Sequence, residues 1–96
     1  MASRVDTVQH EIVDSLRHLG FGVCLLSPLG RGAPDLLVCS PDGRQTVLAE
    51  VKSLGGRLRP AQVCWQANWP AMVYVWHNLT EALATFGIAS KEEAVS

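Results

Sequence analysis

The sequence predicts an α/β domain in which helices flank a mixed four-stranded sheet, in the order α-β-β-β-α-β-α. Three observations favour this fold class. Apolar residues recur at helical spacing near the N-terminus. Two apolar runs flank a Pro-Asp-Gly turn, which is typical of a β-hairpin. A segment that begins with Pro60 then separates the hairpin from another apolar run, so a helix should connect the hairpin to a further strand.

Length and composition indicate one small domain. The chain has 96 residues, of which 48% are hydrophobic and 18% charged, which excludes a disordered, collagen-like or coiled-coil protein. We expect a single domain over residues 1–90 and a polar C-terminal tail over 91–96. Because so small a domain has a limited interior, its high apolar content indicates either a compact core or an additional interface.

The first helix should span about residues 4–19. Ser3 and Asp6 can cap its start, and Gly20 can end it in a left-handed turn. Glu11 falls on the shoulder of the apolar stripe, from which it can face a neighbouring strand. The stripe itself consists of Val5, Val8, Ile12, Leu16 and Leu19.

Three strands should follow. The first is Phe21–Leu26, and the segment Ser27–Pro34 is too rich in Gly and Pro to be regular, so we expect a surface loop. Asp35–Cys39 and Thr46–Lys52 then form the hairpin.

The last third should contain a helix, a strand and a helix. A flexible segment with Gly55-Gly56 leads to a helix from Pro60 to about Trp69, and Met72–Trp76 is a fourth strand. Asn78 and Glu81 can cap a final helix that ends near Gly87.

The apolar runs exclude a membrane-spanning protein. They are far shorter than the roughly 18 residues of a membrane span, so we expect a soluble, cytoplasmic protein.

The cysteines argue against a disulfide framework and a structural zinc site. Cys24, Cys39 and Cys64 are odd in number and lack metal-ligand spacing, which predicts small buried hydrophobic side chains in a reducing compartment.

The charge is unevenly distributed. The net charge of −1 argues against a nucleic-acid-binding protein, but residues 31–60 alone carry a net +2. The basic surplus therefore lies in the middle of the chain.

The polar residues of the third strand carry the chemistry. Glu50 and Lys52 share one face of the strand, whereas Ala49 and Val51 face the core. A charged, exposed strand end would explain this pair equally simply. The hairpin, however, brings Asp35 alongside, so that Asp35 and Glu50 can converge with Lys52 beside them.

Two adjacent carboxylates repel each other unless a cation lies between them. Mg²⁺ or Mn²⁺ prefers such oxygen ligands and leaves coordination positions for a phosphodiester and an attacking water. Lys52 could orient that water or neutralise charge that develops on the phosphate. These three residues are chemically sufficient for phosphodiester hydrolysis.

Three motifs carry a family resemblance: Gly32–Leu37, Glu50–Lys52 and Gly56–Gln62. In this order and spacing they resemble the PD-(D/E)XK nuclease superfamily, and within it the VRR-NUC (virus-type replication-repair nuclease) family, of the single-domain phage or bacterial type. The resemblance covers the chain from the first helix to the last.

The resemblance implies a restriction-endonuclease-like fold and a set of site residues. Asp35 and Glu50 would hold the metal together with the Val51 carbonyl, and Lys52 would be the catalytic lysine. Glu11 would be the additional glutamate that several superfamily members contribute from the first helix. Gln62, on the helix above the sheet, completes the implied site.

The resemblance also implies an Mg²⁺- or Mn²⁺-dependent DNA endonuclease without a small-molecule cofactor, active on branched DNA in the manner of a Holliday-junction resolvase. It would act as a homodimer in a bacterial or phage-infected cell. Two alternatives stay open: a catalytically silent nucleic-acid-binding or assembly module, and a nuclease that acts on flaps or RNA.

The remaining candidates each have a plain explanation beside a functional one. Arg57 and Arg59 follow the Gly-Gly segment and are either solvated or in contact with phosphates, and Arg31 is a weaker case of the same kind. Trp65 and Trp69 lie four residues apart and could pack in the core, stack on an unpaired base or fill a dimer interface. The histidines are expected to be ordinary surface or boundary residues: His10, His18 and His77.

Overall fold

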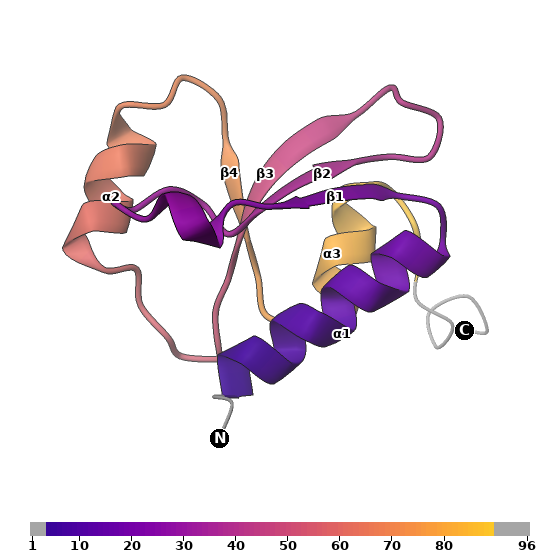
Figure 1. Ribbon diagram of the computed structural model, residues 1–96, viewed down its shortest axis with the longest axis horizontal. Coiled ribbons are helices and arrows are strands. Elements are labelled where there is room, and N and C mark those ends of the chain that lie inside the picture. The colour runs from indigo at the N-terminus through magenta and orange to yellow at the C-terminus, as the bar shows by residue number, and fades with distance from the viewer. Residues whose placement is uncertain (1–3, 90–96) are drawn as a thin grey trace.

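The computed structural model describes residues 4–89, which form one mixed sheet with helices packed on it (Figure 1). The sequence-predicted order of elements and the fold class are confirmed. Neither the predicted Ser3 cap nor the predicted tail over 91–96 lies within the described residues. None of the helices in 4–89 is long and apolar enough to cross a membrane. The elements are α1 (Arg4–His18), β1 (Gly22–Leu25), η1 (Ser27–Leu29), β2 (Leu36–Cys39), β3 (Thr46–Val51), α2 (Pro60–Ala67), β4 (Val73–Trp76) and α3 (Leu79–Thr85).

The sheet has the strand order β1-β2-β3-β4. The pairs β1–β2 and β2–β3 are antiparallel, and β3–β4 is parallel because α2 connects the two strands. The hairpin turn between β2 and β3 is held by Asp42, whose Oδ1 accepts hydrogen bonds from the Ser40 hydroxyl and the Arg44 amide.

Helices α1 and α3 cover the same face of the sheet, below it in Figure 1, and enclose the core. Alternate residues of β3 point to this side and are buried: Val47, Ala49 and Val51. From α1, Ile12 and Leu16 pack against them. The buried Trp76 indole donates from Nε1 to the Thr85 hydroxyl at 2.9 Å, which joins β4 to α3.

The opposite face of the sheet is covered only in part, by α2 and the segment after it. The three cysteines, which all lie within residues 4–89, are free, but the prediction that they are buried is wrong, because Cys24 and Cys64 are exposed and Cys39 is half-buried. Cys24 pairs in register with Leu37, which is also exposed, because none of the described helices covers this part of the sheet.

Ser27–Pro34 was predicted to be an irregular loop, but its first three residues form regular structure. Ser27–Leu29 form a single 3₁₀ turn, η1, in which Pro28 is tolerated because its missing amide costs no internal hydrogen bond in a first turn. Further along, Gly32 has φ +86° and packs against the start of α2, so closely that a Cβ atom would lie 2.2 Å from the Ala61 carbonyl oxygen. The loop before β2 and the start of α2 therefore fix each other's position.

We expect Gly32→Ala to lower the free energy of unfolding by about 2–4 kcal/mol, because it combines a positive φ with a backbone collision. Gly43→Ala is the matched control, since Gly43 also has a positive φ but open space around it. Chemical denaturation of both variants measures the difference. Equal losses would mean that the contact with Ala61 is unimportant.

Candidate active site

A polar hollow of about 400 Å³ lies at the carboxyl end of β3. Side chains from α1, η1, β3 and α2, and from the segments next to them, line it. Its lining residues are Val5, Asp6, Gln9, Ser27, Asp35, Glu50, Val51, Lys52, Arg59 and Gln62.

The two predicted carboxylates converge in this hollow. The antiparallel register pairs Leu36 with Ala49. Asp35 directly precedes Leu36 and Glu50 directly follows Ala49, so the two acids come opposite each other where the hairpin strands meet. The Val51 amide donates to Asp35 Oδ2 at 2.8 Å, and the Leu26 amide donates to the Asp35 carbonyl at 2.7 Å. These backbone contacts hold Asp35 at the edge of the hollow.

Gln62 covers Glu50 and orients its carboxylate. Both side chains are 2% exposed, and the Gln62 amide nitrogen donates to Glu50 Oε1 at 3.0 Å. The Arg59 backbone amide, which can only donate, binds Gln62 Oε1 at 2.8 Å. This bond leaves Gln62 only its NH₂ group to offer Glu50. Among the described residues, Glu50 Oε2 is buried with no hydrogen-bond partner.

The environment of Glu50 favours its protonated form. Burial raises the pKa of Glu50, the neighbouring Asp35 raises it further, and Lys52 and Arg59 oppose the shift only in part, so that the pKa reaches about 8. Without a cation, this site holds a proton on Glu50 at neutral pH.

The donor set suits a hard divalent cation. Paired carboxylates, one with an unpartnered buried oxygen, are the ligands that Mg²⁺ and Mn²⁺ prefer. Within residues 4–89, no three His, Cys, Asp or Glu side chains form a ready-made metal cluster. Two protein carboxylates with further positions left for water and substrate are the usual arrangement for Mg²⁺.

Helix α1 presents a different acid from the expected one. Glu11 is exposed and does not line the hollow, whereas Asp6 and Gln9 do. Five residues separate Glu11 from Asp6, which places them roughly 140° apart around the helix. Asp6 and Gln9 are three residues apart in the sequence, so they lie on one flank of α1 and could have been recognised as a polar pair that faces the sheet. The sequence analysis instead interpreted Asp6 as part of the helix cap.

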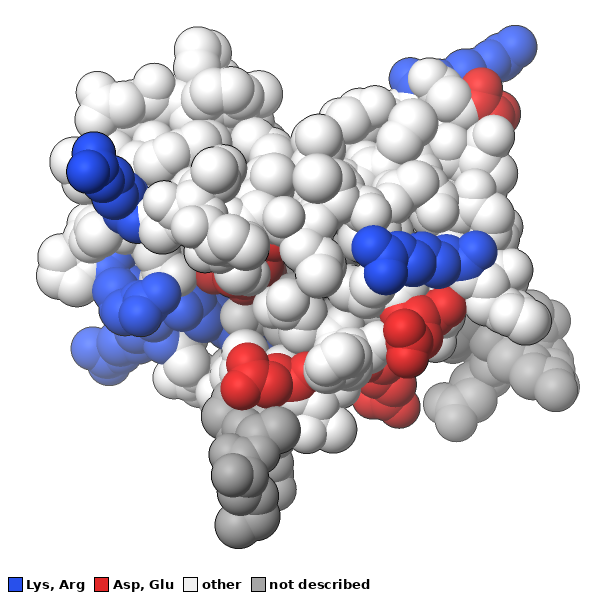
Figure 2. Space-filling model, viewed as in Figure 1, with Lys and Arg blue, Asp and Glu red and all other residues white. Residues whose placement is uncertain are grey.

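Basic residues border the hollow on the side of α2. Lys52 and Arg59 line it, and Arg31 and Arg59 line a second hollow at the start of α2. Arg57 is exposed in the segment that leads to α2. Figure 2 shows acidic atoms recessed near the middle of the molecule, with Lys and Arg side chains gathered beside them on the α2 side. Arg44, by contrast, belongs to the hairpin turn.

The histidines match the simpler expectation. His10 and His18 are exposed on α1. His77 directly follows β4, and both its backbone amide and its Nδ1 contact Glu81 Oε1, at 2.7 and 2.8 Å. The Glu81 carboxylate thus ties the end of β4 to α3, whose first turn is capped by Asn78 as predicted.

Comparison with known proteins finds one solved structure of the same architecture. A chain described as a VRR_NUC domain superposes with a TM-score of 0.71 and 30% sequence identity, over 90% of this chain and 97% of that one. No family model and no curated protein matches this sequence.

The raised pKa of Glu50 gives the metal-free protein a defined pH dependence. A carboxyl group whose folded pKa exceeds its unfolded value stabilises the fold fully below about pH 4.5, and this contribution is lost as the pH rises toward 8. We therefore expect the free energy of unfolding, measured in EDTA, to fall over this range more steeply for the native protein than for Glu50→Gln. Parallel curves for the two proteins would contradict the buried, protonated Glu50.

Proposed function

Because this chain belongs to the VRR-NUC family of nucleases, we propose that it is a metal-dependent endonuclease that hydrolyses phosphodiester bonds in branched DNA. The observation that carries the proposal is the hollow at the end of β3. There, two facing carboxylates, an unpartnered carboxylate oxygen and a lysine lie together beside basic side chains.

Asp35 and Glu50 would hold Mg²⁺ or Mn²⁺, with the Val51 carbonyl as a further ligand. On α1, Asp6 and not Glu11 is the acid that lines the hollow, although it does not form a ready-made cluster with Asp35 and Glu50. When bound, the ion would polarise the scissile phosphate and lower the pKa of an attacking water. It would also replace the proton that Glu50 otherwise carries at neutral pH.

The remaining site residues act on substrate or on the carboxylates. The Lys52 ammonium orients the attacking water and neutralises the charge that develops on the phosphate. Gln62 holds one oxygen of Glu50 through its NH₂ group and leaves the other for the ion. Gln62 is thus a positioning residue.

Arg31, Arg57 and Arg59 would contact the DNA backbone. They lie around the start of α2, next to the hollow, so that a strand bound to them passes the carboxylates. A local basic surface of this kind supplies the attraction that the net charge of −1 does not.

Branched DNA is the proposed substrate because residues 4–89 of one chain carry one such site. Resolution of a four-way junction in the manner of a Holliday-junction resolvase needs two incisions in opposed strands, which a two-fold homodimer supplies. Cleavage assays with four-way junctions, flaps, linear duplex, single strands and RNA, in Mg²⁺, Mn²⁺ or EDTA, separate this activity from a flap or RNA nuclease. No cleavage of any of them would indicate a silent binding module.

We expect Asp35→Asn and Glu50→Gln to abolish cleavage because each removes a carboxylate that would hold the ion. DNA affinity should stay the same or rise, because neither variant adds negative charge near the phosphate and Asp35→Asn removes one. Lys52→Ala should lower the single-turnover rate by about 10²-fold and leave Mn²⁺ binding nearly intact. Glu11→Gln is the matched control and should cleave like the native protein.

Two results would contradict these assignments. A carboxylate variant that cleaves within about tenfold of the native rate, roughly 1.4 kcal/mol of barrier, cannot have lost a metal ligand. Loss of Mn²⁺ binding in Lys52→Ala, measured by calorimetry, would give Lys52 a structural role.

A further inference from the structure

The loop before β2 and the start of α2 enclose a second hollow, of about 390 Å³, next to the active site. Its walls are residues 30–32 and residues 59–62, and two of the residues that line it are arginines, Arg31 and Arg59. We call it the arginine hollow. Arg59 and Gln62 also line the polar hollow that holds the carboxylates, so the two hollows share a wall.

The arginine hollow gathers positive charge that no acid in the described chain neutralises. All of its lining residues are described, and none of them is Asp or Glu. Within residues 4–89, the one salt bridge joins His77 to Glu81, so neither Arg31 nor Arg59 is paired with an acid. Two guanidinium groups beside one cavity repel each other, and an anion bound between them turns this repulsion into attraction.

The backbone at Arg31 indicates that an arginine side chain has a use at this position. Among residues 4–89, Arg31 is the one residue other than glycine with a positive φ, at +56°, and it lies between Gly30 and Gly32. Glycine adopts this conformation without the steric cost of a Cβ atom, so the arginine is less favourable here for the fold. The contact between Gly32 and the Ala61 carbonyl fixes the loop against α2. The fold thus holds a guanidinium beside the hollow at a conformational cost, which is typical of functional sites.

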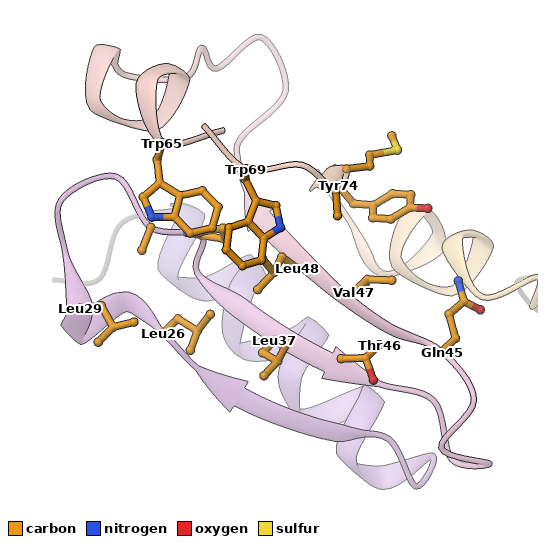
Figure 3. A pocket seen from close by; sticks show the side chains of 14 residues that line it. Leu26, Leu29, Leu37, Gln45, Thr46, Val47, Leu48, Trp65, Trp69 and Tyr74 are labelled. Atoms are coloured by element: carbon orange, nitrogen blue, oxygen red, sulfur yellow. The ribbon is translucent and has the colours of Figure 1, made fainter. Parts of the chain in front are cut away.

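Two other cavities lack this combination of charge and shape. The larger is an apolar groove of about 690 Å³ on the open face of the sheet, where Trp65 and Trp69 lie over leucines of the sheet (Figure 3). None of the described residues that line this groove is charged. The other cavity lies beside Arg17, but Asp14 lines it as well, and the Arg17 guanidinium donates to the Val23 carbonyl at 3.0 Å. An anion therefore finds free counter-charges in the arginine hollow and not in these two cavities.

We propose that the arginine hollow binds one phosphate group of the nucleic-acid strand, the one next to the phosphate that is cut. The inference rests on the proposed function, in which the scissile phosphate lies at Asp35 and Glu50. It separates the roles of the three arginines: Arg31 and Arg59 bind this single phosphate, whereas Arg57, which lines neither hollow, adds only general attraction. Guanidinium groups suit this role because they bind two oxygens of one phosphate through parallel, charge-assisted hydrogen bonds.

The shared wall is the reason to place this phosphate next to the scissile one. Successive phosphates of a strand are joined by a single nucleotide, and Arg59 lines both hollows. The positive charge of Arg59 also acts on Glu50, because it opposes in part the rise that burial gives to the pKa of that carboxyl group. A strand held at Arg31 and Arg59 thus has its next phosphate at the carboxylates. The binding energy of the uncut phosphate positions the cut one, so the contact should affect the rate as well as the affinity.

The first test uses inorganic phosphate in EDTA, so that neither metal nor cleavage is involved. We expect an NMR titration to shift the backbone amides of residues 30–32 and of Ala61 in a saturable manner, because these residues form the walls of the hollow. Arg31→Ala should lose these shifts. Arg44→Ala, which removes the same charge from the exposed hairpin turn, should keep them. Arg31 is itself exposed and alanine keeps its Cβ atom, so the thermal unfolding midpoint should stay unchanged.

The second test removes the charge of one phosphate at a time from the cleaved strand, by means of methylphosphonate linkages. A neutral linkage next to the cut position should lower the single-turnover rate of the native protein and of Arg44→Ala by about tenfold or more. Arg31→Ala should cleave the ordinary strand about tenfold more slowly than the native protein does. It should then be insensitive to the same neutral linkage, because the contact is already lost.

The alternative results separate the site from its role. Absence of amide shifts in the native protein, or shifts that persist in Arg31→Ala, overturns the arginine hollow as a phosphate site. A native protein that is insensitive to the neutral linkage, or an Arg31→Ala variant that keeps the full loss, overturns its place next to the cut phosphate. If phosphate binds as expected but the native protein cleaves no DNA, the phosphate site is supported and the proposed function fails.

Discussion

The burial of Glu50 beside Asp35 is the constraint on which the rest of the structure depends. A carboxylate that is almost wholly enclosed, next to a second carboxylate, is costly in its charged form, and the raised pKa expresses that cost. The surrounding residues reduce the cost without removing it. Gln62 donates one hydrogen bond, and Lys52 and Arg59 supply positive charge, yet one oxygen of Glu50 stays without a partner among the described residues. A divalent cation is the natural counterpart of such a site.

The two faces of the sheet have different roles. The face under α1 and α3 contains the apolar core and gives the strands their register. The other face carries the carboxylates at one end and the apolar groove beside them. Helix α2 reaches both the carboxylates and the groove, because it carries Gln62 against Glu50 and Trp65 against the groove.

The sequence was sufficient for the fold class and for the residues of β2 and β3 that meet in the hollow. The Pro-Asp-Gly turn defines the hairpin register, and the register alone brings Asp35 opposite Glu50. Helix α1 was harder to interpret, because two acids on different flanks of one helix are equally compatible with its apolar stripe. The packing of α1 on the sheet brings Asp6, and not Glu11, to the hollow.

The cysteines and the tryptophans were hard to place for a related reason. Residue type and strand alternation indicate which side chains share a face, but not whether a second layer covers that face. Cys24 is exposed because its face of β1 is uncovered, and Trp65 and Trp69 line a groove instead of entering the core. Cys24, Trp65 and Trp69 thus depart from the expectation on the same open face of the sheet.

The central claim is that a divalent cation replaces the proton of Glu50, and proton release on metal binding tests it most directly. Calorimetric titration with Mn²⁺ in buffers of different ionisation enthalpy counts the protons released. With a pKa of about 8, binding at pH 6 should release about one proton per site, and the number should fall as the pH rises above 8. Tight Mn²⁺ binding that releases no proton at pH 6 would contradict the account.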